Sequence, residues 1–375
     1  MPTTPLNVGV VGGSLGGLFT AALLHQSGHH VTVLERSQTG LARRGAGLVG
    51  QQDLYDILAR LQLAAVARSG VEARERITLD RRGNVLYRDP TPQTQLSWDY
   101  LYDGLRALIP DGRYLLGSAV TAVRPQGREA VVHLERGREQ TFDLVVGADG
   151  LNSVVRGAVA PGQSANRYVG YVTWRGLVPE EALPEPAANV LLDRFAFYTA
   201  RHAHMLGYLV PGADGQTTRG LRRYNWVWYR SLSPADLENL MVQSGHSRTG
   251  VSLAPGDLPA DLRETLVQAA TTELPPAMAQ AVAAEPEPFL QAIYDYVAPR
   301  LSTDNIALVG DAGVVVRPHT AMGAAKAAGD AMALVDLLRT ELSVADALEK
   351  YNQDRLPVGR TIARYGQQLG ESLPL

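Results

Sequence analysis

The chain of 375 residues contains no cysteine. Disulfides, iron–sulfur clusters, thiolate zinc sites and a cysteine nucleophile are therefore excluded. The sequence also lacks an apolar run of the ~18 to 20 residues that a membrane span needs. Its N terminus, MPTTPLN, has no charged segment followed by a cleavable apolar one. These absences predict a cytoplasmic protein that does not bind membranes.

A strong charge of either sign is missing too. The formal net charge is −3, and no run of Lys and Arg is longer than a pair such as Arg43-Arg44, so a nucleic-acid partner is not expected. Hydrophobic residues make up 45% of the chain and charged residues 19%, which is ordinary for a globular protein. The length indicates two domains, or one large domain with an insertion.

Four short apolar runs predict strands of a doubly wound parallel sheet, since strands that are buried on both faces are apolar throughout. They cover residues 8–11, 31–34, 144–146 and 306–309. The last three runs end in ER, GADG and GDA. Ligands of such sheets gather at the carboxyl ends of the strands, so we expect the chemistry at these endings.

The rest of the chain predicts other structure. Residues 119–142 alternate polar and apolar residues as an antiparallel meander does, and residues 167–229 are rich in aromatics and strand-like. Helical patterns follow at 262–274, 323–340 and 344–368, the last with Ser343 as its N-cap. We therefore expect a second sheet that is dense in aromatics and a helical C-terminal part.

The first motif, VGVVGGSLGGLFTAALL, reads as strand, glycine turn and helix. Gly12 and Gly17 hold the outer positions of G-x-G-x-x-G, and Ser14 replaces the middle glycine, where its hydroxyl can bond a phosphate oxygen. Glu35 lies 23 positions after Gly12 (35 minus 12), close to the ~20 expected for an acid that accepts from a ribose hydroxyl. The motif predicts bound FAD or NAD rather than NADP; the alternative is a purely structural turn.

Two later motifs favour FAD. GADGLNSVVR at 147–156 and ALVGDAGVVVRPHTAMGAAKAAGDA at 307–331 each place a short acid, Asp149 or Asp311, beside glycines at a strand end. Either acid alone reads as a turn residue or helix cap, but their occurrence with the first motif favours cofactor contacts. A helix that begins near 322–324 offers N–H groups to the anionic ring of reduced flavin.

These three motifs resemble those of the single-component FAD-dependent aromatic hydroxylases, which have the para-hydroxybenzoate hydroxylase fold. VGYVTWRGLV (169–178), YNWVWY (224–229) and RPHTAMGAAKA (317–327) are further similar to the 2,6-dihydroxypyridine 3-hydroxylase subfamily. The resemblance spans nearly the whole chain. It implies an α/β fold: a Rossmann-like FAD-binding domain, an interleaved mixed or antiparallel β-sheet substrate domain, and C-terminal helices.

The resemblance also implies boundaries and a cofactor site. The FAD-binding domain takes residues 1–73, 98–166 and 291–375, and the substrate domain takes 74–97 and 167–290. The implied FAD contacts are Gly12, Gly13, Ser14, Leu15, Gly17, Glu35, Arg36, Arg43, Gln51, Arg106, Asp149, Gly150, Gly310, Asp311, Pro318, Met322, Gly323 and Ala324. Many relatives place an arginine where this chain has Trp98 or Asp99; Arg106 and Arg43 are the candidates to replace it.

The implied reaction uses NADH or NADPH and O2. The reduced flavin forms a C4a-hydroperoxide, which hydroxylates an electron-rich ring, either a hydroxylated N-heteroaromatic such as 2,6-dihydroxypyridine or a phenol. No metal site is expected, and a homodimer is compatible with this reading. Two other functions stay open: an FAD oxidase or dehydrogenase without oxygen transfer, and a non-catalytic FAD-binding sensor.

The candidates for binding and activating the ring come from the aromatic sheet and the loop after Arg317. As catalytic residues we name His319, Tyr208 and Arg175; as substrate contacts we name Tyr171, Tyr198, Trp226 and, again, His319. A ring hydroxyl that loses its proton is the better nucleophile, so a proton acceptor or relay is needed close to it. The alternative for each aromatic side chain is the hydrophobic core, and for His319 a bond to backbone.

Overall fold

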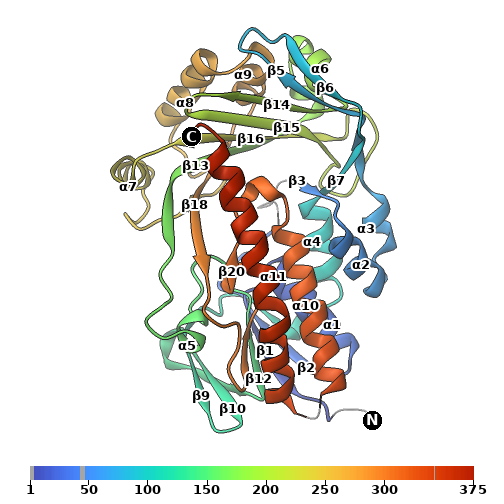
Figure 1. Cartoon of the computed structure of the whole chain (residues 1–375), viewed down its shortest axis with the longest axis vertical. Helices are drawn as coiled ribbons and strands as arrows, with labels where there is room; N and C mark the ends of the chain where they lie inside the picture. Colours follow the sequence, from blue (N-terminus) through green and yellow to red (C-terminus); the bar gives the residue numbers. More distant parts are fainter. Residues whose placement is uncertain (1–3, 43–46, 342) are drawn as a thin grey trace.

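The computed structural model describes residues 4–42, 47–341 and 343–375. The molecule is elongated: a parallel sheet with long helices occupies one half, and a wide sheet capped by shorter helices occupies the other (Figure 1). Within these ranges no helix is long and apolar enough to cross a bilayer.

The sheet of the first half consists of short apolar strands with buried side chains, as the sequence predicts. All its strands pair in parallel. Their order is β19 (Ile306–Leu308), β12 (Leu144–Gly147), β1 (Asn7–Val11), β2 (His30–Leu34) and β8 (Tyr114–Leu115). The four predicted strands are confirmed. Because the strands are parallel, the loops that follow β1, β2, β12 and β19 meet at one edge of the sheet.

Helices complete this half of the molecule (Figure 1). They are α1 (Leu15–Gln26), α2 (Gln52–Arg60), α3 (Ala64–Arg68), α4 (Trp98–Arg106), α5 (Arg156–Val159), α10 (Gly323–Thr340) and α11 (Val344–Ser372). The predicted limits of α10 are confirmed, whereas α11 continues past 368. The Ser343 hydroxyl accepts a hydrogen bond from the Asp346 N–H at 3.1 Å, which confirms it as the N-cap of α11.

The predicted meander is confirmed as an antiparallel sheet beside the parallel one. Its strands are β9 (Val120–Gln126), β10 (Glu129–Leu134) and β11 (Glu139–Phe142). A further small sheet joins the two halves and consists of β3 (Gly47–Val49), β7 (Gln93–Ser97) and β4 (Val71–Ala73). Single-turn 3-10 helices lie at Asp111–Arg113, Glu135–Gly137, Glu180–Ala182, Gly310–Ala312 and Pro318–Thr320.

The sheet of the second half is mixed and mostly antiparallel, as expected. Its order is β17 (Ser252–Leu253), β18 (Phe289–Val297), β13 (Arg167–Pro179), β16 (Arg223–Ser231), β15 (Ala203–Val210), β14 (Arg194–Ala200), β5 (Glu75–Leu79) and β6 (Val85–Asp89), with β20 (Val314–Val315) beside β18. Only β14 and β5 pair in parallel among its described strands. The strands β5 and β6 come from the first quarter of the chain, so the two halves are interleaved in sequence.

This sheet has two different faces. Its outer face packs under α6 (Glu185–Leu191), α8 (Ala260–Glu273) and α9 (Pro276–Ala283), while α7 (Pro234–Gln243) lies to one side (Figure 1). The inner face turns toward the parallel sheet and contacts β3, β4 and β7 through β15. We call it the inner face below. The strand β18 crosses the expected boundary between residues 290 and 291, so the division into two domains stays a prediction.

Candidate active site

The glycine turn after β1 is required by the fold itself. Gly12 has φ +102°, and a Cβ there would collide with the Ala148 carbonyl oxygen. A Cβ on Gly17 would overlap the Gly12 carbonyl oxygen, and one on Gly13 would overlap the Tyr114 hydroxyl. These glycines therefore let α1 start close to β1 and β12, whatever binds there.

The start of α1 is open to an anion. Ser14 is the N-cap in an extended conformation, but its hydroxyl makes no capping hydrogen bond. The side chain is half-buried, and Leu15 begins the helix. The first N–H groups of a helix have no partner within it and carry partial positive charge. The Ser14 hydroxyl and the N–H groups after it are thus free to bind phosphate oxygens.

Glu35 follows β2 and is 4% exposed. One carboxylate oxygen accepts the Gly13 N–H at 2.8 Å and the other accepts the Ser37 N–H at 2.8 Å. The two bonds fix the carboxylate beside the glycine turn, and each oxygen keeps a lone pair for a ligand hydroxyl. The neighbouring Arg36 is exposed.

Asp149 turns toward its own loop. Its carboxylate accepts from the Ser153 hydroxyl at 2.6 Å, the Val154 N–H at 2.7 Å and the Val155 N–H at 3.2 Å. Burial raises the pKa of Asp149, and these three hydrogen bonds oppose that rise. The geometry is that of the cap alternative; a cofactor contact of this loop would be made through backbone near Gly150, which has φ +70°.

Arg156, which the sequence reasoning missed, ties two of the motifs together. It is 1% exposed, and its guanidinium donates to the carbonyl oxygens of Ala312 at 2.9 Å and Asp311 at 2.8 Å. It also donates to Asn166 Oδ1 at 2.7 Å and lies 3.7 Å from the centre of the Tyr296 ring. Arg156 is the final residue of the motif GADGLNSVVR, so it could have been noticed in the sequence. The sequence alone does not tell which carbonyl oxygens a buried arginine contacts.

The loop after β19 is held by a buried network that was also missed. Lys326 donates to the Gly310 carbonyl at 2.9 Å and to Asp330 at 2.8 Å, and both charged side chains are at most 3% exposed. Asp330 also accepts the Gly310 N–H at 3.1 Å and pairs with Arg355 at 2.9 Å. Gly310 is therefore clamped at both of its backbone groups.

The clamp presents Asp311 at the carboxyl end of β19, with a half-buried side chain. Burial raises the pKa of Asp311, whereas the positive charge of Lys326, a hydrogen bond from the Val316 N–H and the charge of Arg156 favour its ionised form. The carboxylate is positioned to accept further hydrogen bonds from a ligand hydroxyl.

The start of α10 offers a second site for negative charge. Pro318 is half-buried and opens the 3-10 turn that leads to the helix. Thr320 Oγ1 accepts the Met322 N–H at 3.0 Å, and Gln51 Nε2 donates to the Ala321 carbonyl at 3.0 Å. The helix begins at Gly323, so the N–H groups of Gly323 and Ala324 have no helical partner. Two helix starts and two available carboxylates suit a dinucleotide that carries phosphates, hydroxyls and an anionic ring.

Asp99, one of the two positions where the resemblance led us to expect an arginine, forms an ion pair between the two halves. Asp99 lies in the first turn of α4, is 3% exposed, and pairs with Arg223 of β16 at 2.7 Å, so it joins the two halves. Arg106 pairs with Asp111 at 3.0 Å and lies 4.5 Å from the centre of the Tyr114 ring. The other candidate, Arg43, lies outside the described residues.

A cluster of rings lies where the inner face meets the loop before α10. The His319 ring stacks on Tyr229 at 4.3 Å and 22°. Tyr171 Oη lies 2.9 Å from His319 Nε2, and Arg317 Nη1 donates to the same hydroxyl at 3.4 Å. Arg317 is itself fixed by Asp295 through two hydrogen bonds of 2.7 Å. His319 is thus held by stacking and by a hydrogen-bonded chain that starts in an ion pair.

The hydrogen-bonded series from Asp295 to His319 bears on the protonation state of His319. Burial, with the nearby His204 and Arg317, lowers the pKa of His319 to about 3, and burial lowers the pKa of His204 to about 4. Burial raises the pKa of Tyr171. A guanidinium only donates, so Tyr171 accepts from Arg317, and its hydroxyl hydrogen stays available for a hydrogen bond to His319 Nε2. When Tyr171 donates in this way, the neutral imidazole carries its proton on Nδ1 and is a hydrogen-bond donor at that atom.

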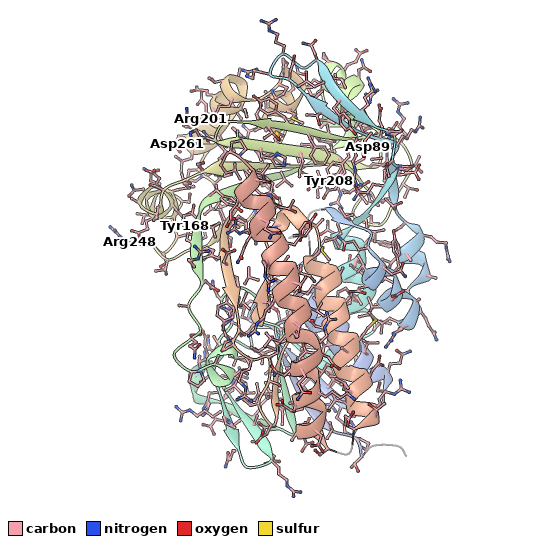
Figure 2. All side chains as sticks on the ribbon, in the orientation of Figure 1. Asp89, Tyr168, Arg201, Tyr208, Arg248 and Asp261 are labelled. Carbon is pink, nitrogen blue, oxygen red and sulfur yellow. The ribbon has the colours of Figure 1, made fainter. Side chains whose placement is uncertain are left out.

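Strand register decides which predicted substrate residues share this face. Tyr171, Arg175 and Tyr208 lie on the inner face, and Figure 2 shows Tyr208 between the wide sheet and the half below it. Tyr208 donates to the Gly47 carbonyl at 3.3 Å, and burial raises its pKa to about 12. The prediction for Tyr198 and Trp226 is wrong in geometry, because both belong to the core under the helices on the outer face.

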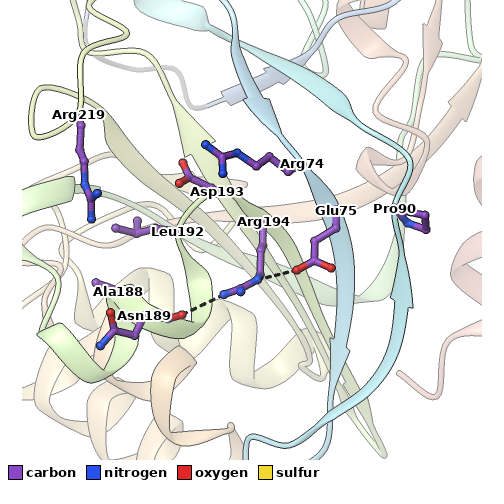
Figure 3. Close-up of a pocket in the computed structure, with 9 residues that line it drawn as sticks. All are labelled: Arg74, Glu75, Pro90, Ala188, Asn189, Leu192, Asp193, Arg194 and Arg219. Carbon is purple, nitrogen blue, oxygen red and sulfur yellow. Dashed lines mark hydrogen bonds and ion pairs between the residues drawn. The ribbon is translucent and has the colours of Figure 1, made fainter.

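An open hollow of about 520 Å³ lies elsewhere, at the outer edge of the wide sheet (Figure 3). It is lined by Arg74, Glu75, Pro90, Ala188, Asn189, Leu192, Asp193, Arg194 and Arg219. Arg194 is occupied there by Glu75 and the Asn189 carbonyl, each at 2.9 Å. None of the lining residues belongs to the ring cluster or the strand-end loops, so this hollow is not the candidate site.

Two family models match parts of the chain. A family model described as NAD(P)-binding Rossmann-like domain matches residues 10–43, and one described as FAD binding domain-like matches residues 168–295. The chain is 29% identical to 2,6-dihydroxypyridine 3-monooxygenase of Paenarthrobacter nicotinovorans, over 96% of this chain and 89% of the relative. It is 28% identical to 3-amino-4-hydroxybenzoate 2-monooxygenase of Streptomyces cremeus, over 99% and 88%.

The solved structure of 2,6-dihydroxypyridine-3-hydroxylase from Arthrobacter nicotinovorans superposes with a TM-score of 0.90 at 26% identity, covering 99% of this chain and 93% of that one. The similarity therefore extends over both halves of the molecule and includes the parallel sheet, the wide sheet and the C-terminal helices. Over nearly its whole length the chain is therefore similar to FAD-dependent aromatic-ring monooxygenases, and it has the para-hydroxybenzoate hydroxylase-like fold.

Proposed function

We propose that this enzyme uses NAD(P)H and O2 to hydroxylate a hydroxylated N-heteroaromatic ring of the 2,6-dihydroxypyridine type or a related phenolic ring. The observation that carries the proposal is the ring cluster of His319, Tyr171 and Tyr229, which lies directly before the start of α10. The similarity to a dihydroxypyridine monooxygenase over almost the whole chain supports the same substrate class.

The residues at the strand ends fit FAD. In the proposed arrangement Ser14 and the start of α1 bind the pyrophosphate, Glu35 binds the adenosine ribose, and Asp311 binds hydroxyls of the ribityl chain. The N–H groups of Gly323 and Ala324 face the pyrimidine side of the flavin ring, where negative charge develops on reduction. When bound there, FAD supplies the acceptance of hydride from NAD(P)H and the activation of oxygen.

The proposal divides the chain by task. Residues 1–73, 98–166 and 291–375 form the cofactor half, and residues 74–97 and 167–290 form the half that binds the ring. Water must stay out while oxygen is transferred, and apolar side chains of the inner face, among them Phe197, Leu206 and Val227, suit that requirement.

Polar residues of the same face orient and activate the substrate in this proposal. His319 donates through Nδ1 to a ring oxygen, Arg175 stabilises the negative charge that a deprotonated ring hydroxyl carries, and Tyr208 limits the position of the ring beside β3. An electron-rich anionic ring reacts faster with an electrophilic oxygen, so holding the anion promotes the reaction.

The test is coupled turnover. The purified flavoprotein is mixed with NADH or NADPH and a panel of hydroxypyridines and phenols, and O2 uptake, product and the ratio of product to NAD(P)H are measured. We expect a hydroxypyridine to stimulate NAD(P)H oxidation and to yield one hydroxylated product per NAD(P)H. An oxidase or dehydrogenase would give no oxygen incorporation, and a flavin-binding sensor would be reduced slowly with every ring.

A further inference from the structure

Two polar side chains on the inner face have no partner. Asn225 of β16 lies opposite Tyr208 and Leu177 in the register, is 0% exposed, and neither atom of its carboxamide is hydrogen-bonded within the described ranges. The Nε atom of Arg175 is likewise buried and unpaired. Arg175 lies opposite Val227, two positions from Asn225 on the same face, so the two side chains are diagonal neighbours.

Arg175 differs from the other arginines that reach into the protein. Arg156, Arg223 and Arg317 each bond to carbonyl or carboxylate oxygens, whereas the guanidinium of Arg175 has neither an ion pair nor a hydrogen bond among the described residues. Native proteins pair almost all buried polar groups, so the buried unpaired Nε atom of the half-buried Arg175 beside an unpaired amide requires an explanation. Their place on the face that holds the ring cluster points to a ligand.

Unpaired polar atoms also occur on the outer face, at Trp226, Trp228 and Tyr224. Those three side chains are embedded in the hydrophobic core under the helices, where a ligand has no place. Asn225 and Arg175 instead face the half that carries the strand-end loops. A substitution at one of these outer-face side chains can therefore be compared with a substitution at Asn225, because only Asn225 faces the proposed ligand.

A carboxamide selects one kind of ring edge. It offers an N–H donor and a carbonyl acceptor side by side, which pair with a ring C=O next to a ring N–H. The lactam form of a 2-hydroxypyridine presents such an edge, and a phenol has a C–H in place of the N–H. On the proposed function, which this step requires, we infer that Asn225 reads the N–H and C=O edge of an N-heterocycle while Arg175 holds its second, anionic oxygen.

Asn225 is then the residue that makes the enzyme select a hydroxylated N-heterocycle over a phenol. Leaving a buried polar group without its partner changes affinity by roughly 10- to 100-fold. The same factor should separate two rings that differ only in the edge that Asn225 contacts. 2,6-Dihydroxypyridine and resorcinol are such a pair, since resorcinol replaces the ring nitrogen by C–H.

The experiment measures the dissociation constants of both rings with the FAD-loaded enzyme, from the change in flavin absorbance without NAD(P)H. The wild type should bind the pyridine roughly 10- to 100-fold more tightly than resorcinol. Asn225→Leu should lose that preference by weakening only the pyridine, and Asn225→Ser, which keeps a small polar group, should lie between. Trp228→Phe, which removes an unpaired N–H from the outer face, is the control and should leave the ratio unchanged.

The inference is overturned if the ratio of the two constants is the same in the wild type, Asn225→Leu and Asn225→Ser. If Asn225→Leu does not fold, by its thermal melting, Asn225→Ser decides alone. Product analysis separates the two claims. If the wild type hydroxylates rings but its preference for the pyridine is unchanged by substitution of Asn225, only the inference is contradicted. A wild type that hydroxylates no ring contradicts the proposed function.

Discussion

Polar side chains named at the strand-end loops have hydrogen-bond partners within the protein, whereas two on the inner face of the wide sheet do not. At the loops, Glu35, Asp149 and Lys326 each have partners from the protein itself. On the inner face, Arg175 and Asn225 have unpaired buried atoms. The polar side chains of the loops are thus held by the protein itself, whereas under our proposal Arg175 and Asn225 find their partners in the substrate. The first arrangement suits a resident cofactor and the second a substrate that comes and goes.

The largest expected effect comes from removing the hydrogen bonds that Arg156 donates to the loop after β19. Arg156→Met leaves the carbonyl oxygens of Asp311 and Ala312 buried without donors, so we expect a loss of at least about 3 kcal/mol in the free energy of unfolding. Flavin content should fall with it, since the loops shift apart. Urea unfolding and the flavin absorbance of the purified variant measure both. Arg128→Ala, at an exposed arginine between β9 and β10, is the control; equal stability of the two variants would contradict the role of Arg156.

The next effect is a decrease in the free energy of unfolding at low pH, caused by the two half-buried histidines His319 and His204. The pKa values of His319 and His204 are lowered to about 3 and about 4, from an ordinary value of 6.5. Between pH 6.5 and about 4 the unfolded chain binds protons that the native protein does not, so stability falls as the pH falls. We expect roughly 1 kcal/mol per pH unit for each histidine in this window.

Unfolding free energies at pH 7 and pH 5 measure this slope. The double variant His204→Asn with His319→Asn should flatten it, because neither asparagine takes up a proton. A double variant with the wild-type slope would show that these histidines are not held neutral.

A smaller effect distinguishes the two faces of the sheet. Tyr208→Phe removes the hydrogen bond to Gly47 on the inner face, so we expect the KM for the ring substrate to rise about 5-fold, equivalent to about 1 kcal/mol. Tyr198→Phe makes the same chemical change on the outer face and should leave KM unchanged. Steady-state kinetics with the preferred hydroxypyridine compares them. A larger effect at Tyr198 would reverse the assignment of the faces.

The smallest effect is expected at the glycine turn. Ser14 makes no capping bond, so Ser14→Gly should cost only a few tenths of a kcal/mol in stability. The affinity for FAD should change by less than about 3-fold, because the backbone donors of the helix start remain. Titration of the flavin-free protein with FAD measures the change. Complete loss of flavin from a folded variant would mean that the serine hydroxyl is indispensable.

The sequence predicts most of the fold because local composition determines it. The four parallel strands are apolar runs that end in glycine or polar residues, and Ser343 has the spacing of an N-cap; both features are visible without tertiary structure. The side of the wide sheet on which a residue lies is different. Alternation along β14 separates Tyr198 from Phe197, but only the position of the cofactor half tells which of them faces it.

The candidate site divides in the same way. Acids at strand ends could be found by their spacing, whereas the direction of a side chain could not: the Asp149 carboxylate turns back to Ser153, and Asp99 pairs with Arg223. Arg156 depends on carbonyls more than 150 positions away, at Asp311 and Ala312. Asn225 could not be singled out from the sequence, because an asparagine within the tryptophan-rich strand β16 is informative only once its lack of partners is known.

The central claim is that the half with the strand-end loops holds a flavin that transfers oxygen to a ring bound at the inner face of the wide sheet. Its most direct measurement is turnover of the FAD-loaded enzyme with NADH or NADPH, 2,6-dihydroxypyridine and oxygen-18 gas, followed by mass spectrometry of the product. The account predicts one labelled oxygen atom in a hydroxylated ring for each NAD(P)H oxidised. Oxidation of NAD(P)H in which neither this ring nor any other of the panel acquires label would contradict it.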